Sequence, residues 1–426
     1  MNYSDAVGYF DAHVGSGVRP GLERIEALVD LMAEPHTAYP VIHVAGTNGK
    51  TSTTLLAAGL VAAHGLKVGA FVSPHLEKIE ERFLIDGEPI TEERFAEALA
   101  DVVPFVDVLE ERTGERPTYF ELTVALALAL FAAEAVDIAV VEVGMGGRWD
   151  ATNVVPAGTA VVTGIGLDHT ATLGSTVAEI AQEKLAIVKP GATLVVGPWP
   201  KEASGAPEAK VEEVGARLLG FGRDFTVDHA VPAVGGWSMD VHSVFGDYEE
   251  VFLRLHGVHQ TENFAVAVAA VEATFDRQLS QEAVRHTAEN ARVPGRIEVL
   301  DRNPLTVIDG AHNPGGISAL VESLATEFPG MRWHAVFGAL RDKDVAAMLA
   351  TLRNLVDDLT VVPVPSPRTI PVHELAELAR QAGFAVTEAE SVASAVADAR
   401  GRAGADGSVV VAGSLYLAGA ARSTLV

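Results

Sequence analysis

A lysine that follows two closely spaced glycines is the first place where this chain could do chemistry. Segment 39–52 reads YPVIHVAGTNGKTS, an apolar run followed by small and polar residues. This order predicts a strand, a tight turn and a helix that continues to His64. Turn N–H groups and a helix N-terminus attract phosphate, while a lysine adds positive charge and a following hydroxyl can bind Mg²⁺. The predicted phosphate-binding residues are Gly46, Thr47, Asn48, Gly49, Lys50, Thr51 and Ser52.

This segment departs from the full phosphate-loop pattern G-x-x-x-x-G-K-[ST]. The pattern needs a glycine five residues before Gly49, where this chain has Val44. A Gly-Lys-Thr triplet also occurs at strand–turn–helix joints whose glycines only allow the turn. The preceding strand, the following helix and the additional Gly46 favour a phosphate site.

Two further polar side chains follow predicted strands. Glu142 stands near the end of the apolar run 137–143, and His169 follows the strand expected at 159–164. Because ligands bind at the carboxyl ends of parallel strands, both residues are expected beside the phosphate loop. Glu142 there would hold Mg²⁺ directly or through water. Alternatively, Glu142 is bonded to a helix N-terminus and His169 has a structural role.

A third candidate group lies in the run DGAHNP at 309–314, after another expected strand. Asp309 could accept hydrogen bonds from ribose hydroxyls, and His312 could stack or bond beside it. A single acid after a strand does not by itself identify a nucleotide site. The sequence has no H-E-x-x-H, no triad spacing and no complete G-x-G-x-x-G, because Gly144-Met-Gly146 lacks the third glycine. Hydrolase and dehydrogenase functions are therefore not supported.

The elements that position these residues alternate between strand and helix. This order predicts an α/β fold, a doubly wound and mostly parallel sheet of the P-loop type with helices on both faces. Shorter alternating segments at 221–255 suggest a small antiparallel patch, and a helix is expected at 207–219. The Val-Pro-Gly at 293–295 marks the expected boundary between an ATP-binding domain, 1–293, and a smaller Rossmann-like domain, 294–426.

Composition limits the classes of function. The chain has 426 residues, of which 48% are hydrophobic, so two folded domains are expected. Its 57 acidic and 31 basic residues give a charge of −26, which repels nucleic acid and anionic membranes. There is no cysteine, no signal-peptide pattern at the N-terminus, and no apolar run long enough to cross a bilayer. We expect a cytoplasmic protein, taken as a monomer because no clear interface stands out.

Twelve short motifs in order resemble one family, the folylpolyglutamate and dihydrofolate synthases of the Mur-type amide ligases. They cover nearly the whole chain, which makes the resemblance specific. The matching segments begin at His43 (HVAGTNGK), Ser73 (SPHL), Tyr119 (YFEL), Glu142 (EVGMGGRWDATN), Gly166 (GLDHT), Glu183 (EK), His259 (HQTEN), Pro294 (PGR), Ile308 (IDGAHNP), Gly338 (GALRDKD), Ser366 (SPR) and Ala412 (AGSLY).

The resemblance implies ATP-dependent addition of L-glutamate to dihydropteroate or to a folate, through an acyl phosphate. It implies that Asn263, Arg296 and Asp309 also bind ATP, and that Ser73, Glu142 and His169 hold Mg²⁺, with two ions expected. His312 is added to the ATP-binding residues from its place beside Asp309, and Thr51 is added to the Mg²⁺ ligands because its hydroxyl follows the lysine of the phosphate loop. It implies that a carbamate on Lys184 helps to hold the second ion, and that Lys50, Lys184 and His169 act in catalysis. The implied substrate-binding residues are Tyr119, Phe120, Glu121, Leu122, Trp149, Asp150 and Ala151.

Several positions depart from the family pattern. Glycine is usual where Thr51 stands, and Ala-Gly is usual where Leu185-Ala186 follows Lys184. In segment 77–82 only Glu81-Arg82 survives from the family's motif. Two alternatives remain: a Mur-type ligase for another acid, such as a cell-wall precursor, and a nucleotide-binding module without ligase activity. The first usually carries a separate N-terminal domain, for which some forty residues leave little room. The second would lack the metal and acceptor residues.

Overall fold

The computed structural model describes residues 1–14, 19–356 and 358–425, which form two compact units. The described residues of Met1–Asp228, Asp240–Val251 and Glu262–Asn290 form unit 1. Those of His229–Met239, Phe252–Thr261 and Ala291–Val426 form unit 2. Both units are discontinuous along the chain, whereas the sequence suggested two continuous domains, 1–293 and 294–426. The last change of unit, at Asn290–Ala291, lies close to the expected boundary.

Unit 1 is built on an eight-stranded sheet with the order β4-β3-β2-β5-β1-β6-β7-β8. Neighbouring strands from β2 to β8 pair in parallel, and β3 and β4 extend the other edge by antiparallel pairing. The strands are β1 (Val41–Ala45), β2 (Val68–Phe71), β3 (Phe83–Ile85), β4 (Glu88–Pro89), β5 (Ile138–Glu142), β6 (Thr159–Val162), β7 (Thr193–Val196) and β8 (Arg217–Gly220). The central strands are fully buried, as their apolar sequences predict.

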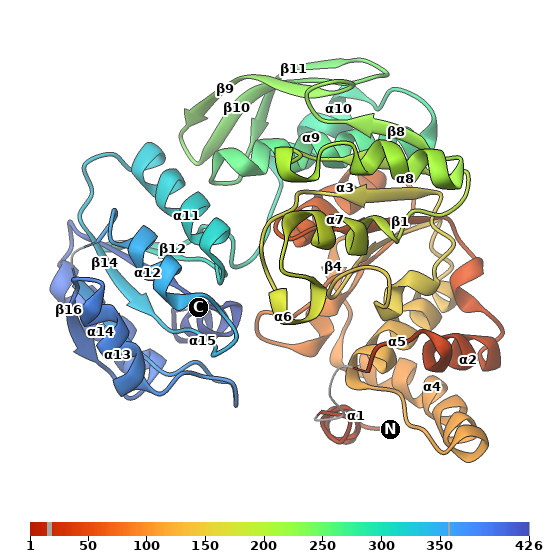
Figure 1. Cartoon of the computed structure of the whole chain (residues 1–426), viewed down its shortest axis with the longest axis horizontal. Helices are drawn as coiled ribbons and strands as arrows, with labels where there is room; N and C mark the ends of the chain where they lie inside the picture. Colours follow the sequence, from red (N-terminus) through yellow and green to blue (C-terminus); the bar gives the residue numbers. More distant parts are fainter. Residues whose placement is uncertain (15–18, 357, 426) are drawn as a thin grey trace. The chain divides into compact units, whose positions relative to one another are not determined.

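Some helices of unit 1 pack on this sheet, and others pack on those helices (Figure 1). The helices of this unit are α1 (Tyr3–Asp11), α2 (Glu23–Leu31), α3 (Lys50–Ala63), α4 (Glu92–Thr113), α5 (Tyr119–Ala133), α6 (Thr170–Leu173), α7 (Val177–Leu185), α8 (Ala206–Val214), α9 (Val258–Phe275) from Glu262 onward, and α10 (Gln281–Glu289). Short 3₁₀ turns stand at η1 (Pro35–Thr37), η2 (Ile79–Arg82), η3 (Ala151–Val154) and η4 (Lys201–Ala203). Helix α3 packs on β1, β2 and β5, while α1, α2, α4 and α5 pack together.

One expected helix is shorter than the sequence suggested. The helix expected at 207–219 ends at Val214, because Gly215 takes a left-handed conformation with φ of 67° and caps it. The residues that follow form the edge strand β8, paired with β7. The patch expected at 221–255 is a three-stranded sheet with the order β11-β10-β9. Its strands are β9 (Thr226–Ala233), β10 (Gly236–His242) and β11 (Asp247–Leu253).

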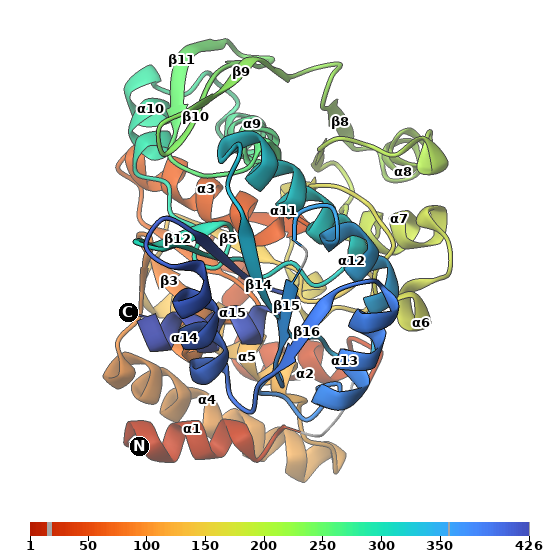
Figure 2. The same cartoon turned by 90° about the vertical axis from the view of Figure 1, so that its left-hand side faces the viewer.

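Unit 2 has its own six-stranded sheet, with the order β12-β13-β17-β14-β15-β16. All neighbours are parallel except β12 and β13. The strands are β12 (Glu298–Arg302), β13 (Leu305–Ile308), β14 (Trp333–Phe337), β15 (Asp358–Val361), β16 (Ala385–Glu388) and β17 (Ser408–Ala412). The helices are α11 (Pro314–Glu327), α12 (Val345–Leu352), α13 (Val372–Gln381), α14 (Val392–Ala403) and α15 (Leu415–Leu425). Helices α11, α12 and α13 share one buried cluster with the sheet, while α14 and α15 pack together against β17 (Figure 2).

The predicted fold class is confirmed: a large, mainly parallel sheet in one α/β unit and a second sheet in the other. Within the described part of the chain, no helix combines the length and the apolar character needed to span a membrane. In the two larger sheets, a loop that carries candidate residues follows the carboxyl end of a parallel strand: the loop after β1 in unit 1 and the loop after β13 in unit 2.

Candidate functional site

The predicted phosphate loop joins β1 to α3, at the carboxyl end of a strand held by β5 and β6 on its two sides. Gly46 and Gly49 have φ of 155° and 85°. A Cβ at Gly46 would lie 1.9 Å from Oγ1 of Thr163, and one at Gly49 would lie 2.4 Å from Oδ1 of Asn263. Both positions therefore require glycine, for space as well as for conformation. Helix α3 starts at Lys50, with Ser52 buried in its first turn.

The loop is tied to the segment that follows β6. The N–H of Thr47 donates to the carbonyl of Gly164 at 2.8 Å, and its hydroxyl donates to the carbonyl of Gly166 at 3.1 Å. The hydroxyl of Thr163 donates to the carbonyl of Asn48 at 2.6 Å. These bonds fix the loop shape before any ligand arrives, as an anion site made of backbone groups requires.

Two lysines converge on one carbonyl of this loop. Nζ of Lys50 lies 3.0 Å and Nζ of Lys184 lies 2.7 Å from the oxygen of Gly46. Lys184 reaches it from the last turn of α7 and is only 4% exposed. Burial and the charge of Lys50 lower the pKa of Lys184 to about 7, against an opposing attraction from Asp168 and Asp150. Two lysine side chains therefore meet at one carbonyl of the loop, in a protein with a net charge of −26.

Glu142 ends β5 beside the first turn of α3. Its carboxylate is 1% exposed and accepts hydrogen bonds from the hydroxyl of Thr51, at 2.9 and 3.1 Å, and from the N–H of Ser73, at 3.1 Å. The structure thus brings together three of the four predicted metal residues. A buried carboxylate next to hydroxyl groups supplies the hard oxygen atoms that Mg²⁺ prefers, so these residues fit that ion. Among the described residues, no group of three or more His, Cys, Asp or Glu could hold a metal by itself. Phosphate and water oxygens would have to complete the shell.

His169, the fourth predicted metal residue, stands at the start of α6 with φ of 49°. Its backbone N–H donates to Oδ1 of Asp168 at 2.8 Å, and its ring Nε2 lies 4.0 Å from Oδ2 of the same carboxylate. Asp168 also attracts Lys184 electrostatically. Sequence reasoning did not assign Asp168, although it stands within the GLDHT motif.

The segment after β5 carries three predicted substrate residues, in three different settings. Trp149 is 54% exposed, while Ala151 is buried at the start of η3. Asp150 is buried and accepts bonds from the N–H of Met145 at 2.8 Å and from the hydroxyl of Thr152 at 2.5 Å. Burial raises the pKa of Asp150, and those hydrogen bonds oppose the rise. Asp150 therefore shapes this segment, and Trp149 is the exposed one of the three predicted residues.

The four predicted substrate residues at the start of α5 also differ in their surroundings. Tyr119 and Phe120 are half-buried, with the guanidinium of Arg82 5.5 Å from the centre of the Tyr119 ring. A Cβ at Gly144 would lie 2.4 Å from Phe120, so α5 touches the segment after β5. Leu122 is fully buried, and Glu121 is buried as the capping-box residue of α5.

Glu121 also makes an ion pair that the sequence did not suggest. Its carboxylate lies 3.0 Å from Nη2 of Arg24 on α2, which is 97 residues away in sequence. Both side chains are largely buried. Neither Arg24 nor Arg82 could be paired with α5 from sequence spacing alone. The structure therefore gives Glu121 a structural partner.

Unit 2 gathers three of the remaining predicted residues at the carboxyl end of β13. Asp309 accepts bonds from the N–H groups of Ile297 and Ala311 at 2.8 and 2.7 Å. Burial raises its pKa, and the charge of Arg296 opposes that rise. His312 holds its Nδ1 2.8 Å from the carbonyl of Gly310. Asn263, in unit 1, lies instead against the phosphate loop.

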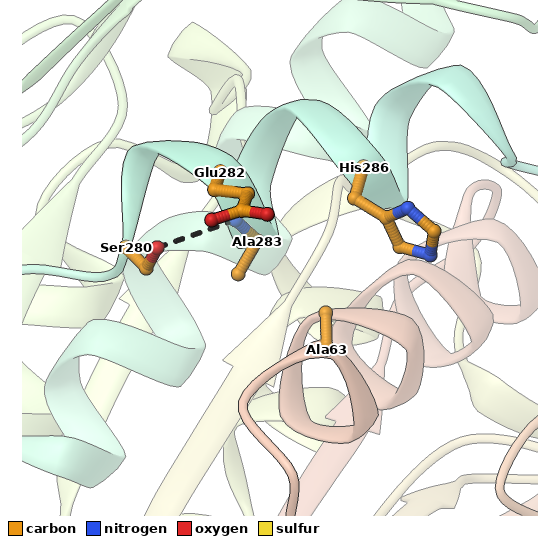
Figure 3. A pocket seen from close by; sticks show the side chains of 5 residues that line it. All are labelled: Ala63, Ser280, Glu282, Ala283 and His286. Atoms are coloured by element: carbon orange, nitrogen blue, oxygen red, sulfur yellow. Dashed lines mark hydrogen bonds between the residues drawn. The ribbon is translucent and has the colours of Figure 1, made fainter.

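A separate surface pocket lies at the other end of α3 (Figure 3). Ala63, Ser280, Glu282, Ala283 and His286 line it. Helix α3 has 14 residues, so this pocket is roughly 20 Å from the phosphate loop. None of the predicted site residues lines it, and its residues offer no arrangement for the predicted chemistry.

Comparison with known proteins yields two family matches. Residues 44–271 match the Mur ligase middle domain, and residues 295–415 match the Mur ligase glutamate ligase domain. The first match contains the phosphate loop, Glu142 and Lys184. The second contains Arg296, Asp309 and His312.

Similar proteins cover almost the whole chain. The dihydrofolate synthase/folylpolyglutamate synthase of Mycobacterium tuberculosis is 37% identical over 438 residues, covering 95% of this chain and 90% of that protein. The crystal structure of M. tuberculosis folylpolyglutamate synthase with ADP and AMPPCP is similar with a TM-score of 0.95 and 37% identity, covering 100% of this chain and 99% of that one. That of E. coli FolC with DHPP and ADP is similar with a TM-score of 0.89 and 31% identity, covering 98% and 96%.

Proposed function

Because this chain belongs to the folylpolyglutamate and dihydrofolate synthase family of the Mur ligases, we propose that it adds L-glutamate to dihydropteroate, to folates, or to both. The family consists of ATP-dependent ligases, so the protein is an enzyme. The observation that carries the proposal is the convergence of Lys50 and Lys184 on the phosphate loop, next to the carboxylate of Glu142. One relative was solved with DHPP and ADP, and another with ADP and AMPPCP, which supports a substrate pair of this kind.

The chemistry explains why such a basic loop is needed. A carboxylate is a poor acyl donor, so its oxygen first attacks the γ-phosphorus of ATP, and ADP leaves. The product is an acyl phosphate, and the amine of glutamate then attacks its carbonyl carbon and displaces phosphate. Because the first step brings two anions together, fixed positive charges and oriented N–H groups lower its barrier most. We assign this role to Gly46–Ser52, with Lys50 as the positive charge.

Glu142, Thr51, Ser73 and His169 are the residues that would hold Mg²⁺. Bound there, the ion would neutralise charge on the phosphates, as it does in other nucleotide sites. We propose that a carbamate on Lys184 would help to hold a second ion. Its low pKa supports this proposal, because only a neutral amine can react with CO₂.

The remaining residues are proposed to bind the organic parts of the substrates. Asn263, Arg296, Asp309 and His312 would contact the nucleotide, with Asp309 on the ribose. Tyr119 to Leu122 and Trp149 to Ala151 would bind or shape the site for the pterin side, with Tyr119, Phe120 and Trp149 the most accessible of them. We further propose that the protein is cytoplasmic and that it is a monomer. Sedimentation of the purified protein tests its oligomeric state.

The experiment that tests this function measures phosphate release from ATP with L-glutamate and one acid at a time. The acids are dihydropteroate, a reduced folate and a cell-wall precursor. Turnover with either of the first two, and its loss in Lys50→Ala, would support the proposal. Turnover with the cell-wall precursor alone would replace the folate assignment with the other Mur-type activity.

A further inference from the structure

A line of three buried polar side chains connects β1 to the segment after β5. Nε2 of His43 lies 2.8 Å from the hydroxyl oxygen of Thr152, and that hydroxyl donates to Oδ1 of Asp150 at 2.5 Å. His43 and Thr152 are completely buried, and Asp150 nearly so. His43 and Thr152 stand within motifs that carry the family resemblance, but neither has a part in the chemistry described above.

The direction of these hydrogen bonds follows from the number of protons. The hydroxyl of Thr152 has one proton, which it gives to the carboxylate of Asp150, so it accepts a proton from Nε2–H of His43. His43 therefore carries a proton on Nε2. Its Nδ1 is buried and has no hydrogen-bond partner among the described residues.

A histidine in this position is unfavourable for packing alone. His43 points to the same side of β1 as Val41 and Ala45, both of which are buried and apolar. A half-satisfied imidazole in such surroundings is less favourable than an apolar side chain of similar size. Among the described residues, the bond to Thr152 is the hydrogen bond that the His43 ring makes.

The two ends of this line differ in how firmly they are held. Strand β1 pairs with β5 and β6, and the phosphate loop that follows it is tied down by Thr47 and Thr163. Segment 144–150 belongs to no strand or helix, and η3, which follows it, is a single 3₁₀ turn. Besides the line, Arg148 ties this segment to α7: its backbone N–H donates to the carbonyl of Glu183 at 3.1 Å, and its side chain pairs with the Glu183 carboxylate at 2.9 Å. Loss of the line should therefore displace this segment and leave the phosphate loop in place.

We propose that His43 and Thr152 are positioning residues, which hold the substrate-binding segment 144–152 at a fixed distance from the ATP phosphates. The proposal rests on the assignment of Trp149 and its neighbours to the acid substrate. The pair acts on the affinity for that acid rather than on ATP, and neither residue touches a reacting atom.

Two pairs of variants test the proposal. The amide nitrogen of glutamine can take the place of Nε2 of histidine, whereas the shorter asparagine reaches only the place of Nδ1. His43→Gln should keep KM for the folate substrate within about twofold, and His43→Asn should raise it roughly tenfold, the effect of one lost buried hydrogen bond. Thr152→Ser should keep KM for the folate substrate near its wild-type value, as His43→Gln does, and Thr152→Val should raise it, as His43→Asn does. KM for ATP should change by less than about twofold in all four.

The combination His43→Asn/Thr152→Val should raise KM no more than the larger single effect, because both substitutions break the same line. Equal KM values for the Gln and Asn variants, or matched rises in KM for folate and ATP, would overturn the proposal. Melting temperatures identify a variant that does not fold. If His43→Asn is such a variant, the Thr152 pair decides.

The choice of acid substrate by the wild-type enzyme tests the proposed function separately from the positioning role. If it uses only a different acid, the folate assignment fails, and KM for that acid is then measured in the same variants. A selective rise in that KM would still support the positioning role, and an unchanged KM would refute it.

Discussion

Lys184 offers the sharpest prediction, because its surroundings change its chemistry. An ordinary lysine with a pKa of 10.5 has about one neutral amine in three thousand at pH 7. With a pKa of about 7, roughly half of the Lys184 side chains are neutral. The structure thus provides on the order of a thousandfold more reactive amine, at a carbonyl of Gly46 that Lys50 also contacts. We predict that Lys184 takes up CO₂ as a carbamate.

The assay is ¹³C NMR of the protein in ¹³C-labelled bicarbonate. One carbamate signal should appear, grow as the pH rises through about 7, and be absent in Lys184→Met. Lys189→Met is the matched control, because Lys189 is also partly buried and bonded to Asn153, and it should keep the signal. Absence of the signal at pH 8 in saturating bicarbonate, or its persistence in Lys184→Met, would refute the reasoning.

The same pKa predicts how stability depends on pH. Between about pH 7 and pH 10.5 the unfolded chain binds a proton at Lys184 that the folded protein does not. The free energy of unfolding should therefore rise with pH in this window, and the penalty for burying the ammonium is complete below it. Lys184→Met should stabilise the protein more at pH 6 than at pH 10, by a few kcal/mol, on the order expected for a shift of this size. Denaturant titrations at the two pH values measure the difference, and equal effects would contradict it.

Three further substitutions test other parts of the site. Gly46→Ala should abolish ATP binding measured by calorimetry, because the new Cβ would lie 1.9 Å from Oγ1 of Thr163. Gly65→Ala is the control: Gly65 has φ of 77° but nothing within 4 Å of the new Cβ, so the substitution should lower the free energy of unfolding by about 1 kcal/mol and leave activity unchanged. Glu142→Gln should raise the Mg²⁺ concentration for half-maximal activity by roughly tenfold or more, and an unchanged Mg²⁺ titration would remove Glu142 from the metal site. Arg24→Met should lower the free energy of unfolding by about 2 to 3 kcal/mol, because it leaves the buried Glu121 without its cation. Lys78→Met is its control and should change stability little, since the pair Lys78–Glu92 is exposed; equal losses in the two variants would argue against the buried pair.

Local patterns were sufficient to predict the strand, tight turn and helix that carry Gly46 to Ser52, and the strands around them. The loop depends on Gly46, Gly49 and Lys50, which are close in sequence, and β5 is a continuous apolar run ending in Glu142. Edge strands were harder to predict. Strand β8 has four residues and is fixed by pairing with β7, a contact that residue preferences within 207–219 do not encode.

The contacts that shape the site are mostly between distant segments. Lys184 reaches Gly46 across 138 residues, and His43 reaches Thr152 across 109. The family resemblance singled out Lys184, but sequence spacing could not give its burial or its shared carbonyl with Lys50. The discontinuous units are also set by three-dimensional packing, so a boundary inferred from Val293-Pro294-Gly295 could only divide the chain once.

The most direct test follows oxygen from the acid to phosphate. The wild-type enzyme is given ATP, L-glutamate and dihydropteroate, or a folate, whose reacting carboxylate carries ¹⁸O. One ¹⁸O atom of each carboxylate should appear in the inorganic phosphate released, and Lys50→Ala should release none. ¹⁸O found in AMP would contradict the acyl-phosphate route. So would ¹⁸O found in the amide product and in water but absent from the phosphate.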